Sequence, residues 1–150
     1  MLTVAEIMTR EPYALGPENT LGDALQLMAE HHIRHIPILS AQQQLIGLVS
    51  QRDLLAASES SVASTNADHM RQGQPITMSN VMTVALHTME ETASLRGAAM
   101  HLLKNKLGCL PVTSEGRLTG IITDTDFVAI AINLMEQLEA AEPPESDESY

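Results

Sequence analysis

The chain of 150 residues is poor in the side chains that usually cross-link or anchor a small protein. It contains one cysteine, no tryptophan, one phenylalanine and two tyrosines. A single cysteine, Cys109, excludes an internal disulfide and fits a reducing compartment such as the cytoplasm. With so few rings the core has to be aliphatic, and the nine methionines are expected to fill gaps in it.

Basic residues are also scarce, because 8 Lys and Arg face 19 Asp and Glu and the formal net charge is −11. No basic stripe with interleaved aromatic residues is present, which disfavours nucleic-acid and anionic-membrane partners. The first residues show no secretory signal pattern. The longest apolar stretch, 127–132, is too short to span a bilayer. We therefore expect a cytoplasmic protein that binds neither nucleic acid nor membrane.

The most informative feature that is present is an internal repeat, in which residues 7–55 return as residues 81–128. Each copy has about fifty residues, too few to bury a comfortable core alone. The copies are therefore expected to pack on each other, with a ligand site at their seam. The recurring pairs are Ile7-Met8-Thr9 with Val81-Met82-Thr83, Leu21 with Leu95, Pro37 with Pro111, and Gly47-x-x-Ser50-x-x-Asp53 with Gly120-x-x-Thr123-x-x-Asp126.

Each copy is expected to form an α/β (α+β) unit in the order strand, helix, strand, strand, helix. Hydrophobic periodicity and capping residues carry this prediction. The predicted strands are 12–15, 35–39 and 45–49 in the first copy and 83–86, 110–112 and 118–122 in the second. Helices are predicted to begin after Thr20, Ser50, Ser94 and Thr123, the last covering about 124–141. The predicted organisation is repeat 1 at 1–57, a linker at 58–73 with a short helix near 66–70, repeat 2 at 74–141, and a disordered acidic tail at 142–150.

The duplicated Ser/Thr-x-x-Asp motif has two interpretations. It is a helix capping box, in which the hydroxyl accepts from the backbone and the acid suits the helix dipole. It is equally a ligand site, because a helix N-terminus suits phosphate and a carboxylate can accept from both ribose hydroxyls. On the second interpretation, Gly47 and Gly120 remove a side chain where the ligand approaches the backbone.

These motifs, each present twice and in the same order over roughly residues 3–135, resemble a tandem pair of cystathionine-β-synthase (CBS) domains, the Bateman module. The resemblance implies two β-α-β-β-α repeats packed about a pseudo-two-fold axis. It also implies a stand-alone regulatory module, not an enzyme, that binds AMP, ADP, ATP or S-adenosylmethionine between the repeats. No cofactor and no catalytic residue are expected. In such modules the motif acid holds the ribose and apolar residues of the partner copy receive adenine.

Carried over residue by residue, the resemblance implies two sites that each draw on both copies. Ile36 and Leu110, next to the strand prolines, are expected to line the respective pockets. The first site would use Ser50, Asp53, Thr83 and the segment 84–87 ending in His87. The second would use Thr123, Asp126, Thr9 and Tyr13.

The two sites are not expected to be equal. Arg34, His35 and Arg52 lie near the first site, and cations there can pair with phosphate. The matching positions of the second copy are Gly108, Cys109 and Thr125, with Lys104 and Lys106 more distant. A phosphorylated ligand is thus expected at the first site and a weaker or absent one at the second. The alternative is that both arginines are solvated surface charges.

Other features of the chain carry less. The run His31-His32-x-x-His35 is not expected to bind a metal, because adjacent histidines cannot both face the third. Cys109 is expected to be a buried core thiol. The apolar surplus of helix 124–141 predicts a homodimer, which such modules often form as a flat disc. The effector protein is unknown. The alternatives are a structural dimerisation module with degenerate pockets or the regulatory subunit of a separate enzyme.

Overall fold

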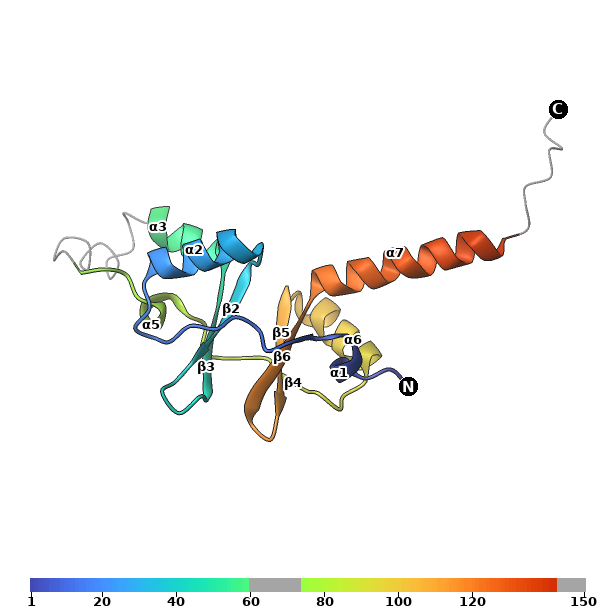
Figure 1. Ribbon diagram of the computed structural model, residues 1–150, viewed down its shortest axis with the longest axis horizontal. Coiled ribbons are helices and arrows are strands. Elements are labelled where there is room, and N and C mark those ends of the chain that lie inside the picture. Colours follow the sequence, from blue (N-terminus) through green and yellow to red (C-terminus); the bar gives the residue numbers. More distant parts are fainter. Residues whose placement is uncertain (60–73, 143–150) are drawn as a thin grey trace, which may run out of the picture.

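The computed structural model describes residues 1–59 and 74–142 (Figure 1). The expected short helix near 66–70 and most of the expected linker and tail lie outside these residues. Two α/β units lie side by side, each with helices against one face of a small sheet. The elements of the first copy are α1 (Val4–Ile7), β1 (Thr9–Arg10), α2 (Leu21–His31), β2 (His35–Leu39), β3 (Leu45–Ser50) and α3 (Gln51–Glu59). Those of the second copy are α5 (Met78–Val81), β4 (Met89–Glu90), α6 (Leu95–Asn105), β5 (Cys109–Ser114), β6 (Arg117–Thr123) and α7 (Asp124–Ala141).

The predicted helices and the two long strands of each copy are confirmed. Thr20 caps α2 by accepting from the Asp23 N–H, and Ser94 caps α6 by accepting from the Gly97 N–H. Helix α3 continues to Glu59 and so covers the first two residues of the expected linker. Both strand prolines are accommodated because the neighbouring chain does not require their missing N–H groups; the Pro37 carbonyl accepts from the Leu15 N–H at 3.1 Å.

The short strands lie elsewhere than predicted. Strand β1 pairs antiparallel with β6, and β4 pairs parallel with β5. The sheet that contains them has the order β1-β6-β5-β4. In the other unit β2 pairs with β3. The isolated bridge Leu15–Ile38 takes the place that the β4–β5 pair has in the four-stranded sheet, and the bridge Thr83–Leu48 takes the place of the β1–β6 pair. The predicted strands 12–15 and 83–86 are thus wrong except at Leu15 and Thr83. Each segment pairs through a single residue, and one residue has no hydrophobic alternation from which a strand could be predicted.

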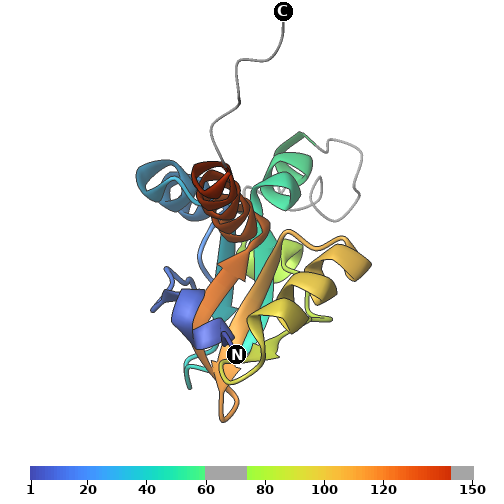
Figure 2. The same ribbon diagram turned by 90° about the vertical axis from the view of Figure 1, so that its right-hand side faces the viewer.

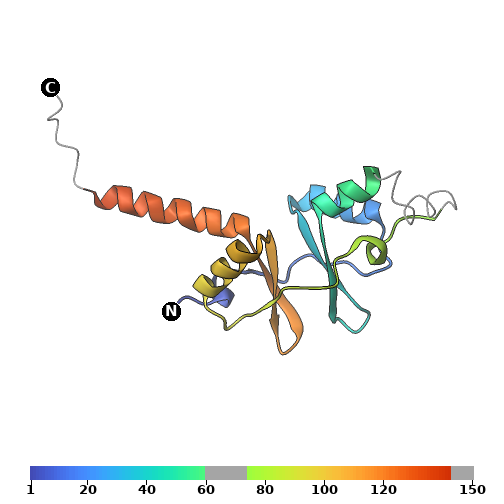
Figure 3. The ribbon, with the colours of Figure 1, turned by 180° about the vertical axis from the view of Figure 1, so that it is seen from behind.

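The structural halves do not coincide with the sequence repeats, because each copy gives its first segment to the other. The Leu95 N–H donates to the Leu2 carbonyl at 2.8 Å, and the Leu21 N–H donates to the Ile76 carbonyl at 2.8 Å. The same exchange docks α1 on α6 and β6, and α5 on α3 and β3 (Figure 3). Exchanging the copies turns the first hydrogen bond into the second and the α1–β6 contact into the α5–β3 contact, which is the expected pseudo-two-fold relation.

A methionine and a glycine make the tightest contact of this exchange. A Cβ placed on Gly47 would overlap the Met82 sulfur, and one placed on Gly120 would overlap the Met8 sulfur. These glycines therefore make room for a side chain of the other copy, and the expectation that they make room for a ligand is corrected. Each methionine is next to a threonine that pairs with the same strand, Thr83 with Leu48 and Thr9 with Ile121.

Two separate hydrophobic cores result, and each contains residues from both copies. Met78 of the second copy is fully buried among Ile36, Ile38 and Val49 of the first. Val4 of the first copy is fully buried in the core built around Leu110 of the second. Neither unit can therefore form its native core from its own repeat alone.

Helix α7 extends from the second unit into solvent, so that it is seen end-on in Figure 2. None of its residues is buried. Its exposed large apolar side chains are Val128, Ile132, Leu134, Met135 and Leu138, each between 51% and 67% exposed. In the described part of the chain no helix combines the length and the apolar character needed to cross a bilayer.

Replacing Gly47 with alanine should lower the free energy of unfolding by about 1–3 kcal/mol, because the new methyl group has to displace Met82 from a filled site. Urea unfolding followed by circular dichroism measures this loss. The additional substitution Met82→Ala should restore part of it, and the coupling in the double-mutant cycle then reports the contact itself.

The matched control is Gly22→Ala in helix α2. A Cβ there would lie 3.7 Å from Thr20 Oγ1, which is ordinary van der Waals contact. This variant should be stabilised by up to about 1 kcal/mol, through helix propensity. Equal unfolding free energies for the two glycine variants would contradict the methionine–glycine fit.

Candidate functional site: a cleft between the two repeats

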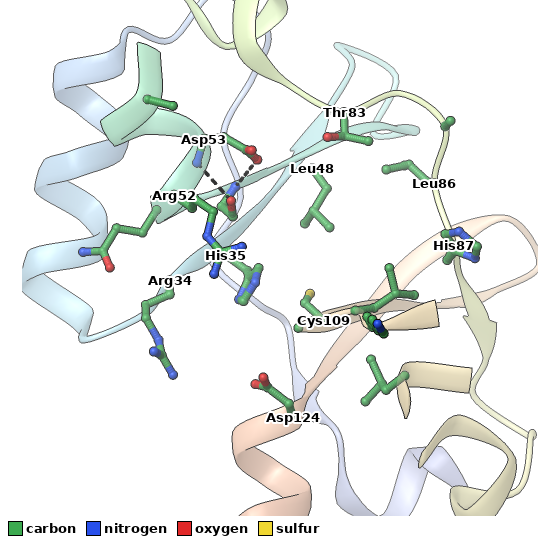
Figure 4. A pocket seen from close by; sticks show the side chains of 18 of the residues that line it. Arg34, His35, Leu48, Arg52, Asp53, Thr83, Leu86, His87, Cys109 and Asp124 are labelled. Atoms are coloured by element: carbon green, nitrogen blue, oxygen red, sulfur yellow. Dashed lines mark hydrogen bonds between the residues drawn. The ribbon is translucent and has the colours of Figure 1, made fainter. Parts of the chain in front are cut away.

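A cleft of about 1290 Å³ lies between the two units (Figure 4). This volume accommodates a nucleotide-sized molecule. Strand ends and the start of α3 form one wall; the segment before β4, the end of α6 and the start of α7 form the other. The polar lining residues are Arg34, His35, Ser50, Gln51, Arg52, Asp53 and Glu59 from the first copy and Thr83, His87, Lys106, Cys109 and Asp124 from the second.

The Ser50–Asp53 motif forms a complete capping box at the start of α3. The Asp53 N–H donates to Ser50 Oγ at 3.1 Å, and the Ser50 N–H donates to Asp53 Oδ2 at 3.0 Å (Figure 4). At the start of α7 the Asp126 N–H donates to Thr123 Oγ1 at 3.3 Å and the Thr123 N–H donates to Asp126 Oδ2 at 2.8 Å. The cap uses Oδ2 of Asp53 and holds the carboxylate in place on the cleft wall.

Three permanent cations line the cleft: Arg34, Arg52 and Lys106. Lys106, which the sequence suggests only as a more distant cation of the second site, lines this cleft. It follows α6 in the left-handed conformation, with φ of 54°, and this turn brings it to the cleft. Arg34 is held from both sides, because its carbonyl accepts from the Gln51 N–H at 2.8 Å and its guanidinium donates to Thr125 Oγ1 at 3.2 Å.

His35 lies between the motifs of the two copies. A Cβ on Gly108 would be 3.1 Å from His35 Nε2, so that the imidazole occupies the space left by that glycine. Burial lowers the pKa of His35 below its ordinary value; Asp124 and Asp53 oppose this, and Arg34 adds to it. The ring is therefore neutral at pH 7 and can donate from one nitrogen and accept at the other.

Apolar side chains from both copies also line the cleft. Leu48 projects from the first copy, while Leu86, Leu107 and Phe127 belong to the second. Sequence analysis had named only the segment 84–87 in general terms. The other apolar residues were missed because they belong to helices and strands that read as core. Nothing in the hydrophobic pattern of the sequence shows that these side chains line the cleft between the copies.

Of the thirteen expected ligand residues, seven line this cleft and two are corrected. Ile36 and Leu110 are fully buried in the two hydrophobic cores. Neighbouring residues of a strand point to opposite faces, so His35 faces the cleft and Ile36 faces the helices. The seven residues are Arg34, His35, Ser50, Arg52, Asp53, Thr83 and His87.

The remaining four residues belong to the expected second site. Thr9 pairs with Ile121 of β6, the strand that leads to Thr123 and Asp126. The first segment of one copy thus lies beside the motif strand of the other, as the resemblance implied. Tyr13 stacks on His31 with ring centroids 3.8 Å apart. Its ring is thereby held against the end of α2.

Comparisons with known proteins agree on the fold. The family model for the CBS domain matches residues 4–60 and 78–133. A chloroplastic CBS domain-containing protein of Arabidopsis thaliana, CBSX1, is 31% identical over 153 aligned residues that include 88% of this chain. The chain spans 65% of that relative's length.

Two solved structures are similar over nearly their whole length. A putative acetoin utilization protein, AcuB, from Vibrio cholerae is 45% identical, with a TM-score of 0.76 and coverage of 95% of this chain and 99% of that one. CBSX2 of Arabidopsis thaliana, crystallised in complex with AMP, is 27% identical, with a TM-score of 0.75 and coverage of 90% and 99%.

The buried thiol of Cys109 gives a chemical test of the cleft wall. Burial raises the pKa of this thiol to about 12, and Asp124 and Asp126 add to the effect. At pH 8 the thiol should therefore react with iodoacetamide at least about a hundredfold more slowly than in the chain unfolded by guanidinium. Similar rates in both states, followed by mass spectrometry, would show that Cys109 is a reactive thiolate.

Proposed function

Because the chain belongs to the CBS domain family and carries two such domains in tandem, we propose that it is a regulatory module that binds an adenosine-containing ligand in the cleft. AMP, ADP, ATP and S-adenosylmethionine are the candidates. The observation that carries this proposal is the convergence of a helix-capping carboxylate, three cations and an apolar wall on one cleft. The AMP complex of the related CBSX2 supports it.

Asp53 is proposed to hold the ribose. Its carboxylate is fixed by the Ser50 N–H, so that ordering it costs little entropy when a ligand arrives. Vicinal hydroxyls can donate to a carboxylate, and hydrogen bonds to charged groups contribute about 1.5–3 kcal/mol each. Adenine is proposed to lie against the apolar wall near Leu48 and Leu86, with Thr83 beside it.

The phosphate is proposed to lie towards Arg34, Arg52 and Lys106, with Ser50 and His35 as further partners. The net charge of −11 gives a polyanion no long-range attraction. A preference for phosphate therefore has to arise from these local cations and from the start of α3. Release of Arg34 from Thr125 would free its guanidinium for a bidentate contact.

The second site is proposed to be weaker. Thr123, Asp126, Thr9 and Tyr13 remain its candidate residues, but Gly108 and Thr125 stand where the first site has Arg34 and Arg52. The helix that would receive the ligand begins with two carboxylates, Asp124 and Asp126. A neutral or less phosphorylated adenosyl compound suits it better than ATP.

The second candidate function is structural dimerisation without a ligand. It is favoured by the capping boxes themselves, because their bonds explain both motif acids without any ligand. In either case the module acts by binding and not by catalysis. A role as the regulatory partner of a separate enzyme is compatible with both.

Replacing Asp53 with asparagine separates the two candidate functions. The amide oxygen can still accept from the Ser50 N–H, so that the cap and the unfolding free energy should change by less than about 0.5 kcal/mol. Loss of the charged acceptor should weaken AMP and adenosine alike by about ten- to a hundredfold. Isothermal titration calorimetry measures both affinities.

Asp23→Asn is the matched control, because Asp23 forms the same capping box at the start of α2 and does not line the cleft. It should leave AMP affinity unchanged. AMP affinity that is the same in the parent and in Asp53→Asn would exclude Asp53 from the ribose site. If no nucleotide stabilises the parent in a thermal-shift panel, the dimerisation function is favoured.

The cations can be tested in the same titrations. Arg34→Ala combined with Arg52→Ala should bring the ratio of AMP to adenosine affinity towards one, since adenosine does not use them. Raised salt should narrow the ratio in part. An undiminished ratio would mean that the backbone of α3 holds the phosphate, and that both arginines are solvated surface charges.

A homodimer through α7 is the assembly we propose. Val128, Ile132 and Met135 recur at intervals of four and three residues and form an exposed apolar stripe. Light scattering should give the mass of two chains at micromolar concentration, and Ile132→Glu with Met135→Glu should give the mass of one. Gln137→Glu, on the opposite side of the helix, should remain dimeric. A parent of monomer mass would refute this assembly.

A further inference from the structure

Two histidines outside the proposed ribose and phosphate contacts meet at the edge of the cleft. His87 Nδ1 lies 3.0 Å from His101 Nε2, and the two rings are inclined at 59°. His87 precedes β4 and lines the cleft, whereas His101 belongs to α6 (Figure 4 labels His87). His87 is exposed and His101 half-buried, so that solvent and small ions reach the pair.

Both backbones that carry these rings are held in place. The residue after His101, Leu102, is buried in the core of the second unit. The His101 carbonyl accepts from Asn105 Nδ2 at 2.9 Å. His87 lies between Thr83, which pairs with Leu48, and Met89, which pairs with Val112. The fold therefore holds the two backbones where the side chains can meet, and a ligand that needs both rings finds them close together.

Only one proton can lie between His87 Nδ1 and His101 Nε2. Two neutral imidazoles that face each other nitrogen to nitrogen share a single N–H, which one ring donates and the other accepts. If the donor ring changes tautomer, so that its proton moves to its other nitrogen, both facing nitrogens present lone pairs to an ion. Neutral imidazole is the commonest metal ligand among protein side chains, through either of its nitrogens.

The spacing indicates which ions fit. With metal–nitrogen bonds of about 2.0–2.1 Å, nitrogens 3.0 Å apart subtend an angle of about 94° at the metal. Tetrahedral coordination would need about 3.3–3.4 Å at the same bond length. Angles near 90° are typical of tetragonal Cu²⁺ and Ni²⁺, which also bind nitrogen ligands more strongly than the earlier divalent metals.

We propose that His87 and His101 form a binding site for a divalent late transition metal, of the Cu²⁺ and Ni²⁺ class. In residues 1–59 and 74–142, no group of three or more His, Cys, Asp and Glu side chains could hold an ion, so that water completes the coordination and the ion exchanges readily. The net charge of −11 favours cation binding. A bound ion joins the segment before β4 to α6 and thereby fixes one edge of the cleft.

The site does not depend on the proposed nucleotide, and it is tested without one. Tag-free protein is titrated with NiCl₂ and with CuCl₂ in a calorimeter at pH 7.5. We expect one ion per chain at this site, and a loss of at least tenfold in affinity in His87→Asn with His101→Asn. The electron paramagnetic resonance spectrum of the Cu²⁺-loaded parent should show coupling to two nitrogen nuclei, and that of the double variant should not.

His31→Asn with His32→Asn is the matched control, because it removes the same number of imidazoles from the end of α2. His32 has φ of 54°, a conformation that asparagine tolerates. This control should bind both ions as the parent does. Metal affinity that is unchanged in the His87/His101 variant, or lost in the His31/His32 control, would overturn the proposal.

The single variant His101→Gln guards against a folding artefact, since glutamine has high helix propensity. It should keep the parent's melting temperature and lose the two-nitrogen signal. If the site exists, saturating metal and a cleft ligand should change each other's affinity by equal factors. This second measurement reports only the coupling between the metal and the cleft ligand. The metal-site proposal therefore stands even if the nucleotide proposal fails.

Discussion

The exchange of first segments between the two repeats is the constraint on which the rest of the structure depends. Met8 packs over Gly120 and Met82 over Gly47, and the threonine after each methionine pairs with the same strand. A side chain larger than hydrogen at either glycine would push the other copy's segment away. The cores would then lose Val4 and Met78, which are fully buried. The two units are therefore expected to fold together and not in succession.

The cleft follows from this exchange. Strand β3, which ends at Ser50, has as its neighbour a segment of the other copy, so that residues 83–87 pass beside the first motif and join the two walls of the cleft. The pseudo-two-fold relation makes the two motif helices equivalent in backbone. What distinguishes them is side-chain identity, with Arg34 and His35 in one copy and Gly108 and Cys109 in the other. The absence of a side chain at Gly108 leaves space for the imidazole of His35, which lies against this glycine.

The sequence predicted the fold class, the capped helices, the long strands and the seam between copies, because each has a strong local pattern or a duplicated motif. Residue spacing did not predict the exchange, since similar copies offer no sign of which copy a segment contacts, and only the resemblance to CBS domains implied it. Ile36 was placed in the pocket because it adjoins His35 and Pro37, although the two-residue period of a strand turns it to the opposite face. Lys106 was not assigned to the first site because its approach depends on a left-handed residue at the end of α6, a conformation that glycine usually supplies.

Capping and ligand binding, which the sequence presents as alternatives, are compatible in this geometry. The capping box orients Asp53 through one oxygen and leaves the carboxylate on the cleft wall. A carboxylate that is already fixed loses less entropy on binding than a free one, so that the cap favours recognition. Arg34 extends the same principle across the repeats, because its guanidinium is held by Thr125 in the first turn of α7. A ligand that draws Arg34 towards a phosphate has to break this bond. The residue that the cleft's arginine contacts therefore lies in the first turn of the helix that extends to the proposed partner chain.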